Sequence, residues 1–353
     1  MLHHVTSISV THSVTHLEDC TGHDPGKEPM PKEAMYTALN DIKADFNSIY
    51  TNRDPRAYFQ VLGQLDYIIP HLAQPLFEQL ILARAELQEE PITILDLGCS
   101  YGLNGALMKY ALDYEALRER YTSPTLQCLS SEDMLQLDRA FYRAWPRHPR
   151  VRVIGLDVSE NAVGYAERCG AVDLGLSLDL EKSDPDPETA AALTQVDLIV
   201  STGCVGYVTS RTFERLAKLA RHGRPAWVAS FVLRMFPYDS IAKTLEKLGL
   251  VTERFEGATF VQRRFASVDE MQSTIQAVGA RGLDTRGRES EGLFHADLFI
   301  SRPPSEIERL PIQNLVSVVS GANKPWRVGT NVLGGMARTA KARRPRISVV
   351  RGS

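Results

Sequence analysis

An acidic residue followed by a glycine-rich turn marks the stretch of this sequence that can bind a ligand. The segment 91–109 reads PITILDLGCSYGLNGALMK, in which Asp96 precedes Gly98, Ser100 and Gly102. Glycine has no Cβ, so the backbone can turn tightly and come close to a bound molecule. A helix that begins just after the turn offers free N–H groups to that molecule. A plain connection between a strand and a helix is the alternative interpretation.

A second carboxylate stands at the end of another apolar run. Asp157 ends the segment 151–158, which reads VRVIGLDV, and a helix that Ser159 caps is predicted to follow. At the tip of a second strand, a carboxylate can accept hydrogen bonds from both hydroxyl groups of a ribose, as in dinucleotide-binding folds. A helix-capping acid is the alternative. The long separation from Asp96 indicates an insertion, which we interpret as two short helices near residues 130–145.

Two further strands are predicted to end beside these residues. The segment 171–180 closes on Asp179 and Leu180, and the segment 196–204 contains Ser201 near its end. Ligands of open parallel sheets bind at the carboxyl ends of the strands, near the reversal of strand order. We therefore predict that all these residues lie at one site.

The elements that position the site alternate along the chain, which predicts an α/β doubly wound sheet over residues 91–302. The later strands are predicted at residues 226–233, 281–288 and 293–301, and the later helices at residues 189–193, 212–221, 240–248 and 267–278. Residues 236–266 are interpreted as a second insertion beside the site.

The regions outside this sheet divide into three predicted parts. Residues 33–90 have helical patterns at 34–50, 55–69 and 70–88, and we predict that they form a lid. Residues 1–32 contain several histidines in no zinc-binding spacing, which favours a disordered leader over a metal-binding tract. Residues 303–353 are predicted to be a flexible extension. Its basic end suggests either contact with nucleic acid or acidic partners, or a disordered tail, and we favour the second.

Composition excludes several classes of protein. The net charge of −3 and the pI near 6.3 give no sign of a nucleic-acid-binding surface, and 43% hydrophobic residues suffice for a globular core. The five cysteines have neither CxxC spacing nor an even number, so no disulfide framework or metal site is predicted. Neither a membrane span nor a signal peptide is evident. We expect a cytoplasmic protein whose partner is a small molecule, and the oligomeric state stays open.

The glycine turn, Asp157 and the closing strand pair resemble those of class I S-adenosylmethionine (SAM) dependent methyltransferases. The sequence departs from the family pattern at Ser100, where the middle glycine is expected, and a serine there can also cap the helix. The resemblance implies a Rossmann-like, seven-stranded sheet, a lid of N-terminal helices and SAM as the cofactor.

The same resemblance assigns roles to individual residues. It implies that the cofactor lies against the turn from Asp96 to Gly102 and that Asp157 binds its ribose. The residues expected to contact the adenine edge are Asp179 and Leu180. Ser201 and the three residues after it would face the transferred group. No acidic or amide residue followed by two prolines stands there, which disfavours DNA as the substrate.

Candidates for catalysis are few. Methyl transfer depends mainly on positioning and on exclusion of water, and a general base is needed only for a protonated acceptor. No carboxylate or histidine is singled out for that role, and Tyr207 is a candidate for cation–π contact with the sulfonium. Cys204 is either a nucleophile or, as we favour, a structural thiol. Arg263, Arg264 and His295 are candidate substrate contacts, with purely structural roles favoured for each.

Three hypotheses about function follow. The first is a methyltransferase that acts on a small molecule in secondary metabolism, because the lid and the insertions would enclose a pocket. The second is a cyclase of the same fold, which converts SAM into azetidine-2-carboxylate and methylthioadenosine. The third is a non-catalytic protein that binds SAM and interacts with a partner. The acceptor itself stays open.

Overall fold

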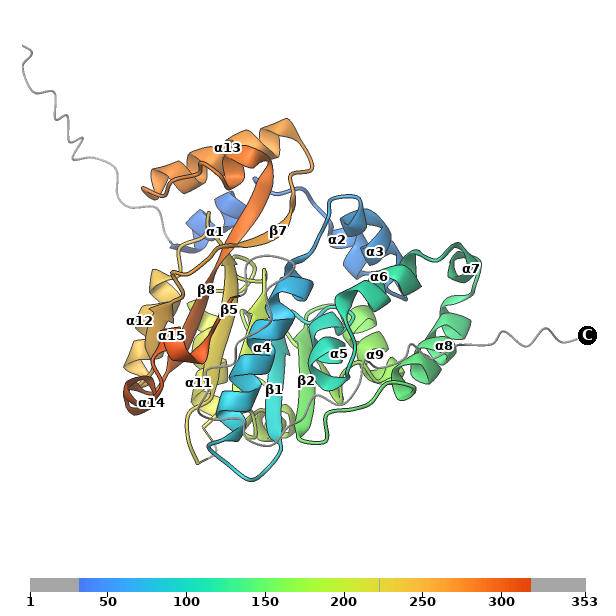
Figure 1. The fold of residues 1–353 in the computed structure, drawn as a ribbon, viewed down its shortest axis with the longest axis horizontal. Coiled ribbons are helices and arrows are strands. Elements are labelled where there is room, and N and C mark those ends of the chain that lie inside the picture. The colour runs from blue at the N-terminus through green and yellow to red at the C-terminus, as the bar shows by residue number, and fades with distance from the viewer. Residues whose placement is uncertain (1–31, 222, 319–353) are drawn as a thin grey trace, which may run out of the picture.

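The computed structural model describes residues 32–221 and 223–318, so the predictions for residues 1–31 and for the basic tail lie outside the described residues. Residues 303–318, predicted to belong to a flexible extension, instead contain two short helices with Ile312 and Leu315 buried. The centre of the described chain is an eight-stranded sheet with the order β3-β2-β1-β4-β5-β8-β6, and β7 pairs with β8 (Figure 1). The strands are β1 Ile92–Leu97, β2 Val151–Asp157, β3 Leu174–Ser177, β4 Leu198–Thr202, β5 Trp227–Leu233, β6 Val251–Arg254, β7 Phe260–Arg264 and β8 Leu293–Arg302.

The strand order reverses at β1. This strand pairs in parallel with β2 on one side and with β4 on the other. The chain therefore adds β2 and β3 on one side of β1 and then crosses back to add β4 and β5 on its other side. Strand β8 is antiparallel to β5, β6 and β7. The carboxyl ends of β1, β2 and β4 therefore meet at one edge, where an open parallel sheet binds its ligands.

Helices cover both faces of the sheet. Successive residues of β1 point to opposite faces, so Ile92 and Ile94 join one hydrophobic cluster, whereas Leu95 and Leu97 join the other. The first cluster lies beneath α4, α5 and α9, and the second beneath α10, α11 and α12. The helices are α1 Lys32–Asn40, α2 Asn47–Tyr50, α3 Arg56–Gly63, α4 Ile69–Ala85, α5 Leu103–Lys109, α6 Tyr114–Thr122, α7 Pro124–Gln127, α8 Ser131–Arg143, α9 Glu160–Cys169, α10 Pro187–Leu193, α11 Ser210–Leu219, α12 Asp239–Lys247, α13 Val268–Ala280, α14 Pro304–Arg309 and α15 Ile312–Leu315. The predicted doubly wound α/β fold is confirmed.

The N-terminal helices are bonded to the carboxyl edge of the sheet. The Tyr101 hydroxyl, just after β1, donates to the carbonyl oxygens of Ile49 and Asn52 at 2.8 and 3.0 Å. The Ser159 hydroxyl, just after β2, donates to the Tyr50 carbonyl at 2.6 Å. These bonds hold the segment around α2 directly over the strand ends.

Three predicted elements differ from the structure. The helix predicted over 34–50 divides into α1 and α2, and the Ala44 N–H between them donates to Glu270 rather than within a helix. Helix α4 packs on β1, β4 and β7, so it belongs to the face of the sheet. The insertion before β2 holds α6, α7 and α8 rather than two short helices near 130–145.

The strand predicted over 281–288 is wrong, and the sheet has eight strands rather than seven. Gly282 and Gly287 adopt positive φ angles of 72° and 68°, and Asp284 accepts a hydrogen bond from the Arg286 N–H, which makes this segment a turn. The strand at that position in the sheet is β6, a short edge strand that follows α12.

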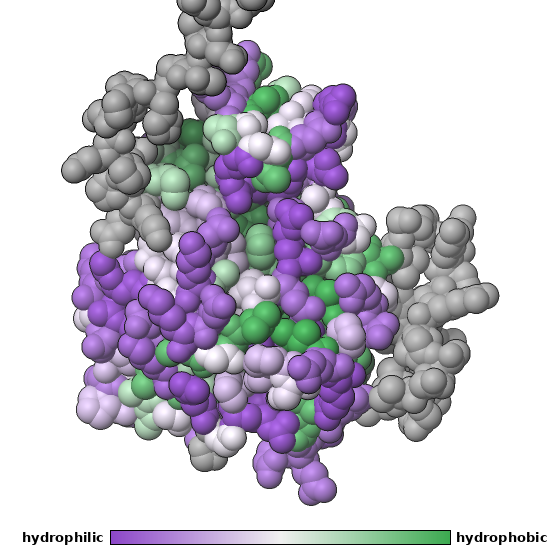
Figure 2. All heavy atoms as spheres, turned by 90° about the vertical axis from the view of Figure 1, so that its left-hand side faces the viewer, coloured by the Kyte–Doolittle hydropathy of each residue, from purple (hydrophilic) through white to green (hydrophobic). Residues whose placement is uncertain are grey.

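The surface visible in Figure 2, which is the left-hand side of Figure 1, is mostly hydrophilic, with smaller groups of hydrophobic residues among the polar ones. Within residues 32–221 and 223–318, the helices are all too short or too polar to cross a membrane.

Candidate functional site

A cavity of about 600 Å³ opens at the carboxyl ends of β1, β2 and β4, beneath the N-terminal helices. Its lining comes from the glycine turn, the ends of β2 and β4, the loop after β3, the segment around α2, and β7. The lining residues are Lys43, Phe46, Tyr50, Thr51, Tyr58, Leu62, Tyr67, Pro70, Leu97, Gly98, Cys99, Ser100, Leu103, Asn104, Leu156, Asp157, Val158, Ser159, Leu178, Asp179, Leu180, Glu181, Thr202, Gly203, Cys204, Tyr207, Val208, Thr212, Gln262 and Arg263. Five of the eight predicted cofactor-binding residues line this cavity, namely Gly98, Ser100, Asp157, Asp179 and Leu180.

The glycine turn adopts left-handed backbone conformations. Gly98, Ser100 and Gly102 have φ angles of 74°, 49° and 77°. A Cβ at Gly98 would lie 2.7 Å from the Cβ of Cys204, and one at Gly102 would lie 2.9 Å from the Cβ of Ala166. The first glycine therefore lets the turn approach the end of β4, and the second lets α5 begin against α9.

Ser100 does not cap α5 as expected, because Gly102 is the residue at the N-cap. The hydroxyl of Ser100 is buried and has no hydrogen-bond partner among the described residues, although it lines the cavity. A buried hydroxyl without a partner is costly unless a ligand satisfies it. Ser100 thus offers a hydrogen bond to a molecule in the cavity.

Asp157 connects the glycine turn with the end of β2. Its Oδ2 accepts from the Ser100 N–H at 2.8 Å, and its Oδ1 accepts from the Ser159 N–H at 3.0 Å. An ionised carboxylate has about four acceptor positions. Asp157 lines the cavity, so it can still accept two hydroxyl groups there. The predicted cap is confirmed, since the Ser159 hydroxyl accepts from the Ala162 N–H.

Asp96 lies beneath the cavity rather than in its lining. Its carboxyl group is fully buried, and burial raises its pKa to about 7. The Asn104 amide donates to Asp96 at 3.4 Å and to the Thr202 hydroxyl at 2.9 Å. Asp96 therefore positions Asn104 and Thr202, which both line the cavity. Asn104 was missed from sequence, although it is a polar residue in the otherwise apolar first turn of α5.

Asp179 and Leu180 line the cavity from the loop after β3, which ends at Ser177, three residues before the predicted end of that strand. The Asp179 carboxylate pairs with Lys182 at 2.8 Å, and this hydrogen bond holds the pKa of Asp179 below its usual value. Glu181 fixes the loop, because its carboxylate accepts from the N–H groups of Thr209 and Thr212 at the start of α11.

Gly102 and Ser201, like Asp96, are absent from the cavity lining. The Ser201 side chain is fully buried and donates to the Ser230 hydroxyl of β5 at 3.0 Å. The next residue, Thr202, faces the cavity instead, since alternate residues of a strand point to opposite faces. Thr202 therefore replaces Ser201 as the candidate contact from β4.

Tyr207 and Cys204 both line the cavity, after β4. The Lys43 Nζ lies 4.2 Å from the centre of the Tyr207 ring, so that face of the ring already contacts a cation. Burial raises the pKa of the Cys204 thiol to about 12, which keeps it neutral and disfavours a nucleophilic role. Tyr207 stays a candidate only for its other face and for its hydroxyl.

The three residues predicted as substrate contacts, Arg263, Arg264 and His295, lie in different environments. Arg263 lines the cavity but is buried and paired with Glu270 at 2.7 Å. Arg264 pairs with Asp66 on the surface at 2.5 Å. His295 is buried outside the lining, and its Nδ1 shares a hydrogen bond with the Thr259 hydroxyl. Only Arg263 reaches the cavity.

Aromatic residues from the N-terminal helices form one wall of the cavity. The ring centres of Tyr50 and Tyr58 are 5.8 Å apart, and those of Tyr58 and Tyr67 are 5.9 Å apart, both with edge-to-face geometry. Phe46 completes this wall. Such a surface favours a planar or apolar ligand.

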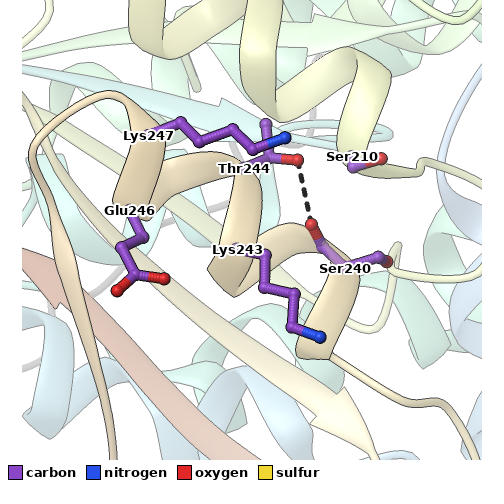
Figure 3. A pocket seen from close by; sticks show the side chains of 6 residues that line it. All are labelled: Ser210, Ser240, Lys243, Thr244, Glu246 and Lys247. Carbon is purple, nitrogen blue, oxygen red and sulfur yellow. Dashed lines mark hydrogen bonds between the residues drawn. The ribbon is translucent and has the colours of Figure 1, made fainter.

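A second hollow, of about 450 Å³, lies between α11 and α12. Its lining residues are Ser210, Ser240, Lys243, Thr244, Glu246 and Lys247 (Figure 3). In Figure 3 the Glu246 side chain extends away from Ser210, and the Thr244 hydroxyl bonds to the Ser240 carbonyl. Because this lining has no aromatic residue and no element of the glycine turn, the candidate site is the larger cavity.

Because Gly98 lies close to the end of β4, we expect Gly98→Ala to lower the free energy of unfolding more than Gly249→Ala does. Gly249 has a φ of 85° and open space around its Cα, so Gly249→Ala tests backbone strain alone, about 1 kcal/mol. Gly98→Ala adds the clash with Cys204 and is expected to cost at least about 1 kcal/mol more. Urea unfolding of both variants measures the difference, and equal losses would mean that the turn does not touch β4.

The parallel strands, the reversal at β1 and the antiparallel β8 together define the architecture around this cavity. The chain has a Rossmann-like, doubly wound fold. No protein-family model matches the sequence, and no curated protein matches it either.

Three solved structures that this chain resembles have low sequence identity to it. Magnesium protoporphyrin IX methyltransferase from Synechocystis PCC 6803, solved with SAM, is 12% identical over 78% of this chain and 99% of its own, with a TM-score of 0.35. The plantazolicin methyltransferase BpumL, with S-adenosylhomocysteine (SAH) and a monoazolic analogue, is 12% identical over 77% and 99%, with a TM-score of 0.36. A precorrin-6y C5,15-methyltransferase from Geobacter metallireducens GS-15 is 10% identical over 64% and 86%, with a TM-score of 0.32.

Proposed function

We propose that this protein is a SAM-dependent methyltransferase that acts on a small molecule. The observation that supports this most strongly is the position of Asp157. Its carboxylate lies at the end of β2, next to the strand at which the order reverses, is held by the N–H groups of Ser100 and Ser159, and keeps acceptor positions toward the cavity. That arrangement suits the two hydroxyls of a ribose.

The rest of the lining fits the other parts of SAM. Leu178 and Leu180 offer an apolar surface for the adenine ring, and Asp179 stands beside them to accept from its amino group. The buried Ser100 hydroxyl and the backbone of Gly98 suit the polar end of the ligand. Bound SAM supplies an electrophilic methyl group on a sulfonium.

The chain's own residues then position the acceptor and exclude water. A cavity of about 600 Å³ is within the usual range for small-molecule sites, roughly 300–1,000 Å³. The segment around α2 closes it from above through the bonds of Tyr101 and Ser159. The aromatic wall supports a planar acceptor, of the kind found in secondary metabolism, and we propose that the enzyme acts in the cytoplasm.

Product analysis tests this function. The purified protein is incubated with SAM and a collection of small phenols, amines and heteroaromatic acids, and the mixture is analysed by mass spectrometry. Methyltransferase activity produces SAH together with an acceptor that is heavier by one CH₂, about 14 mass units, because a methyl group replaces a hydrogen. Methylthioadenosine without any methylated product would indicate the cyclase, and binding without either product would indicate a non-catalytic SAM-binding protein.

A further inference from the structure

Lys43 is a cation of the cavity lining without an acidic partner. It lies between α1 and α2, and its Nζ is 4.2 Å from the centre of the Tyr207 ring and 5.6 Å from that of Phe236. Among the described residues, the Lys43 side chain makes no hydrogen bond or ion pair, and its backbone N–H donates to the Asn40 carbonyl. Lysines in ligand cavities that have no carboxylate partner are free to exchange a proton with the ligand.

The charged groups that face Lys43 come from several elements. Arg263 of β7 repels its positive charge, and Glu270 of α13 attracts it. The Glu270 carboxylate is already paired with another residue, because both of its oxygens accept hydrogen bonds from Arg263, at 2.7 and 2.9 Å. Cys204 and Tyr207 complete the surroundings as neutral groups. Burial first, and then the charge of Arg263, lower the pKa of Lys43 to about 7.

We propose that Lys43 is the general base of the methyl transfer and that the acceptor is a phenol or an aromatic amine. This rests on the proposed function. The neutral amine of Lys43 takes the proton from the acceptor O–H or N–H as the acceptor oxygen or nitrogen forms its bond to the methyl carbon. The carbon–sulfur bond breaks, and its electron pair stays on sulfur to give SAH. The resulting ammonium of Lys43 then releases its proton to water.

The geometry favours this role over that of an anion-binding cation. Lys43 lies beside Tyr207, in the segment that follows β4, whereas Asp157 and Ser100 follow β2 and β1 at the same edge of the sheet. Bound SAM adds a sulfonium charge to the cavity, and a second cation near Lys43 favours its neutral form. The base is therefore deprotonated when the methyl donor is in place. The aromatic wall of Phe46, Tyr50 and Tyr58 supplies the surface for an aromatic acceptor.

The test compares two ligands that differ by one positive charge. The protein is prepared with ¹³C at the lysine Cε, and the Lys43 signal is the one missing from the Lys43→Arg spectrum. Its titration midpoint is followed by NMR in the free protein, with SAH and with SAM. We expect a midpoint near pH 7 in the free protein and one lower by about one pH unit with SAM than with SAH. Lys218 on the surface of α11 lies outside the cavity lining and is the internal reference, because its signal should be the same with either ligand.

The outcomes distinguish a general base from a lysine that only binds the carboxylate of the ligand. Equal midpoints with both ligands would place Lys43 far from the sulfonium and overturn the proposal. Midpoints raised by both ligands would mean that Lys43 pairs with their carboxylate, which also overturns it. The failure of SAM and SAH to bind at all, measured on the same samples, would instead contradict the proposed function.

Substitution gives an independent readout. Lys43→Met should bind SAH within about threefold of the wild type, because the base does not hold the cofactor. With a phenol or amine that the wild type methylates, it should lose roughly 100-fold or more in kcat. The wild-type rise in kcat, which should follow the Lys43 midpoint measured with bound SAM, should also disappear. A Lys43→Met variant with full kcat and an unchanged pH profile would overturn the proposal, and Lys218→Met is the matched control.

Discussion

Asp157→Asn is expected to weaken the binding of SAH by roughly 100-fold. The substitution keeps the size of the side chain but replaces the two charge-assisted hydrogen bonds that we propose to the ribose with weaker ones, a loss of about 3 kcal/mol. It also turns an NH₂ group toward the N–H of either Ser100 or Ser159, both of which donate to Asp157. Calorimetric titration of SAH into each protein gives the two dissociation constants.

Glu160→Gln is the matched control for this substitution. Glu160 is exposed, lies three residues beyond Asp157 in the same loop and helix start, and is not part of the cavity lining. Its substitution removes the same charge and should change SAH affinity by less than about threefold, because an exposed charge is well screened. Similar losses in both variants would mean that charge alone, and not contact with Asp157, governs binding.

Arg263→Met is expected to have the largest effect on folding. Arg263 and Glu270 are both buried, and Arg263 also lies between the rings of Phe46 and Phe294, at 5.1 and 4.7 Å. Removing one partner leaves the other charge buried without compensation, which costs about 3–5 kcal/mol. Urea unfolding followed by circular dichroism measures this loss.

Two further variants separate the ion pair from other effects of Arg263. Arg264→Met, at the neighbouring exposed pair with Asp66, should cost less than about 1 kcal/mol. Adding Glu270→Met to Arg263→Met should restore part of the stability, because no unpaired charge then stays buried. A double variant as unstable as the sum of the two single ones would contradict this explanation.

The pH dependence of this pair has a definite sign. Burial raises the pKa of Glu270, but hydrogen bonds from Arg263 and from the N–H groups of Ala44 and Ala266 outweigh it and hold the pKa below its usual value. The pair therefore stabilises the fold fully above the ordinary pKa of a glutamate, and this contribution is lost as the pH falls through the lowered pKa. In Arg263→Met, the loss of stability at acidic pH should be correspondingly smaller.

The parts of the site that sequence predicts are those fixed by local structure. The glycine turn, the strand that ends at Asp157 and the cap at Ser159 depend on residues close together in the chain, and the structure has all three. Ser201 shows the limit of this reasoning. Successive side chains of a strand point to opposite faces, so a prediction that is wrong by one position names a core residue instead of a cavity contact. Here Thr202 lines the cavity, whereas the predicted Ser201 is buried against Ser230.

The residues that sequence reasoning missed reach the site from distant segments. Lys43 comes from the N-terminal helices and Gln262 from β7, and neither belongs to a motif. The two segments meet where Arg263 of β7 lies 5.1 Å from the centre of the Phe46 ring, a contact between residues far apart in sequence. Such neighbours follow from tertiary packing, which periodicity and turn residues cannot indicate. The missed strand β6 is similar, since an edge strand of four residues has little alternation to detect.

Calorimetric titration of SAM into the purified protein tests the central claim most directly. We expect one SAM per chain with a dissociation constant in the micromolar range, and loss of most of this affinity in Asp157→Asn but not in Glu160→Gln. A protein that stays folded and shows no binding of SAM at millimolar concentration would contradict the assignment of this cavity as a SAM site.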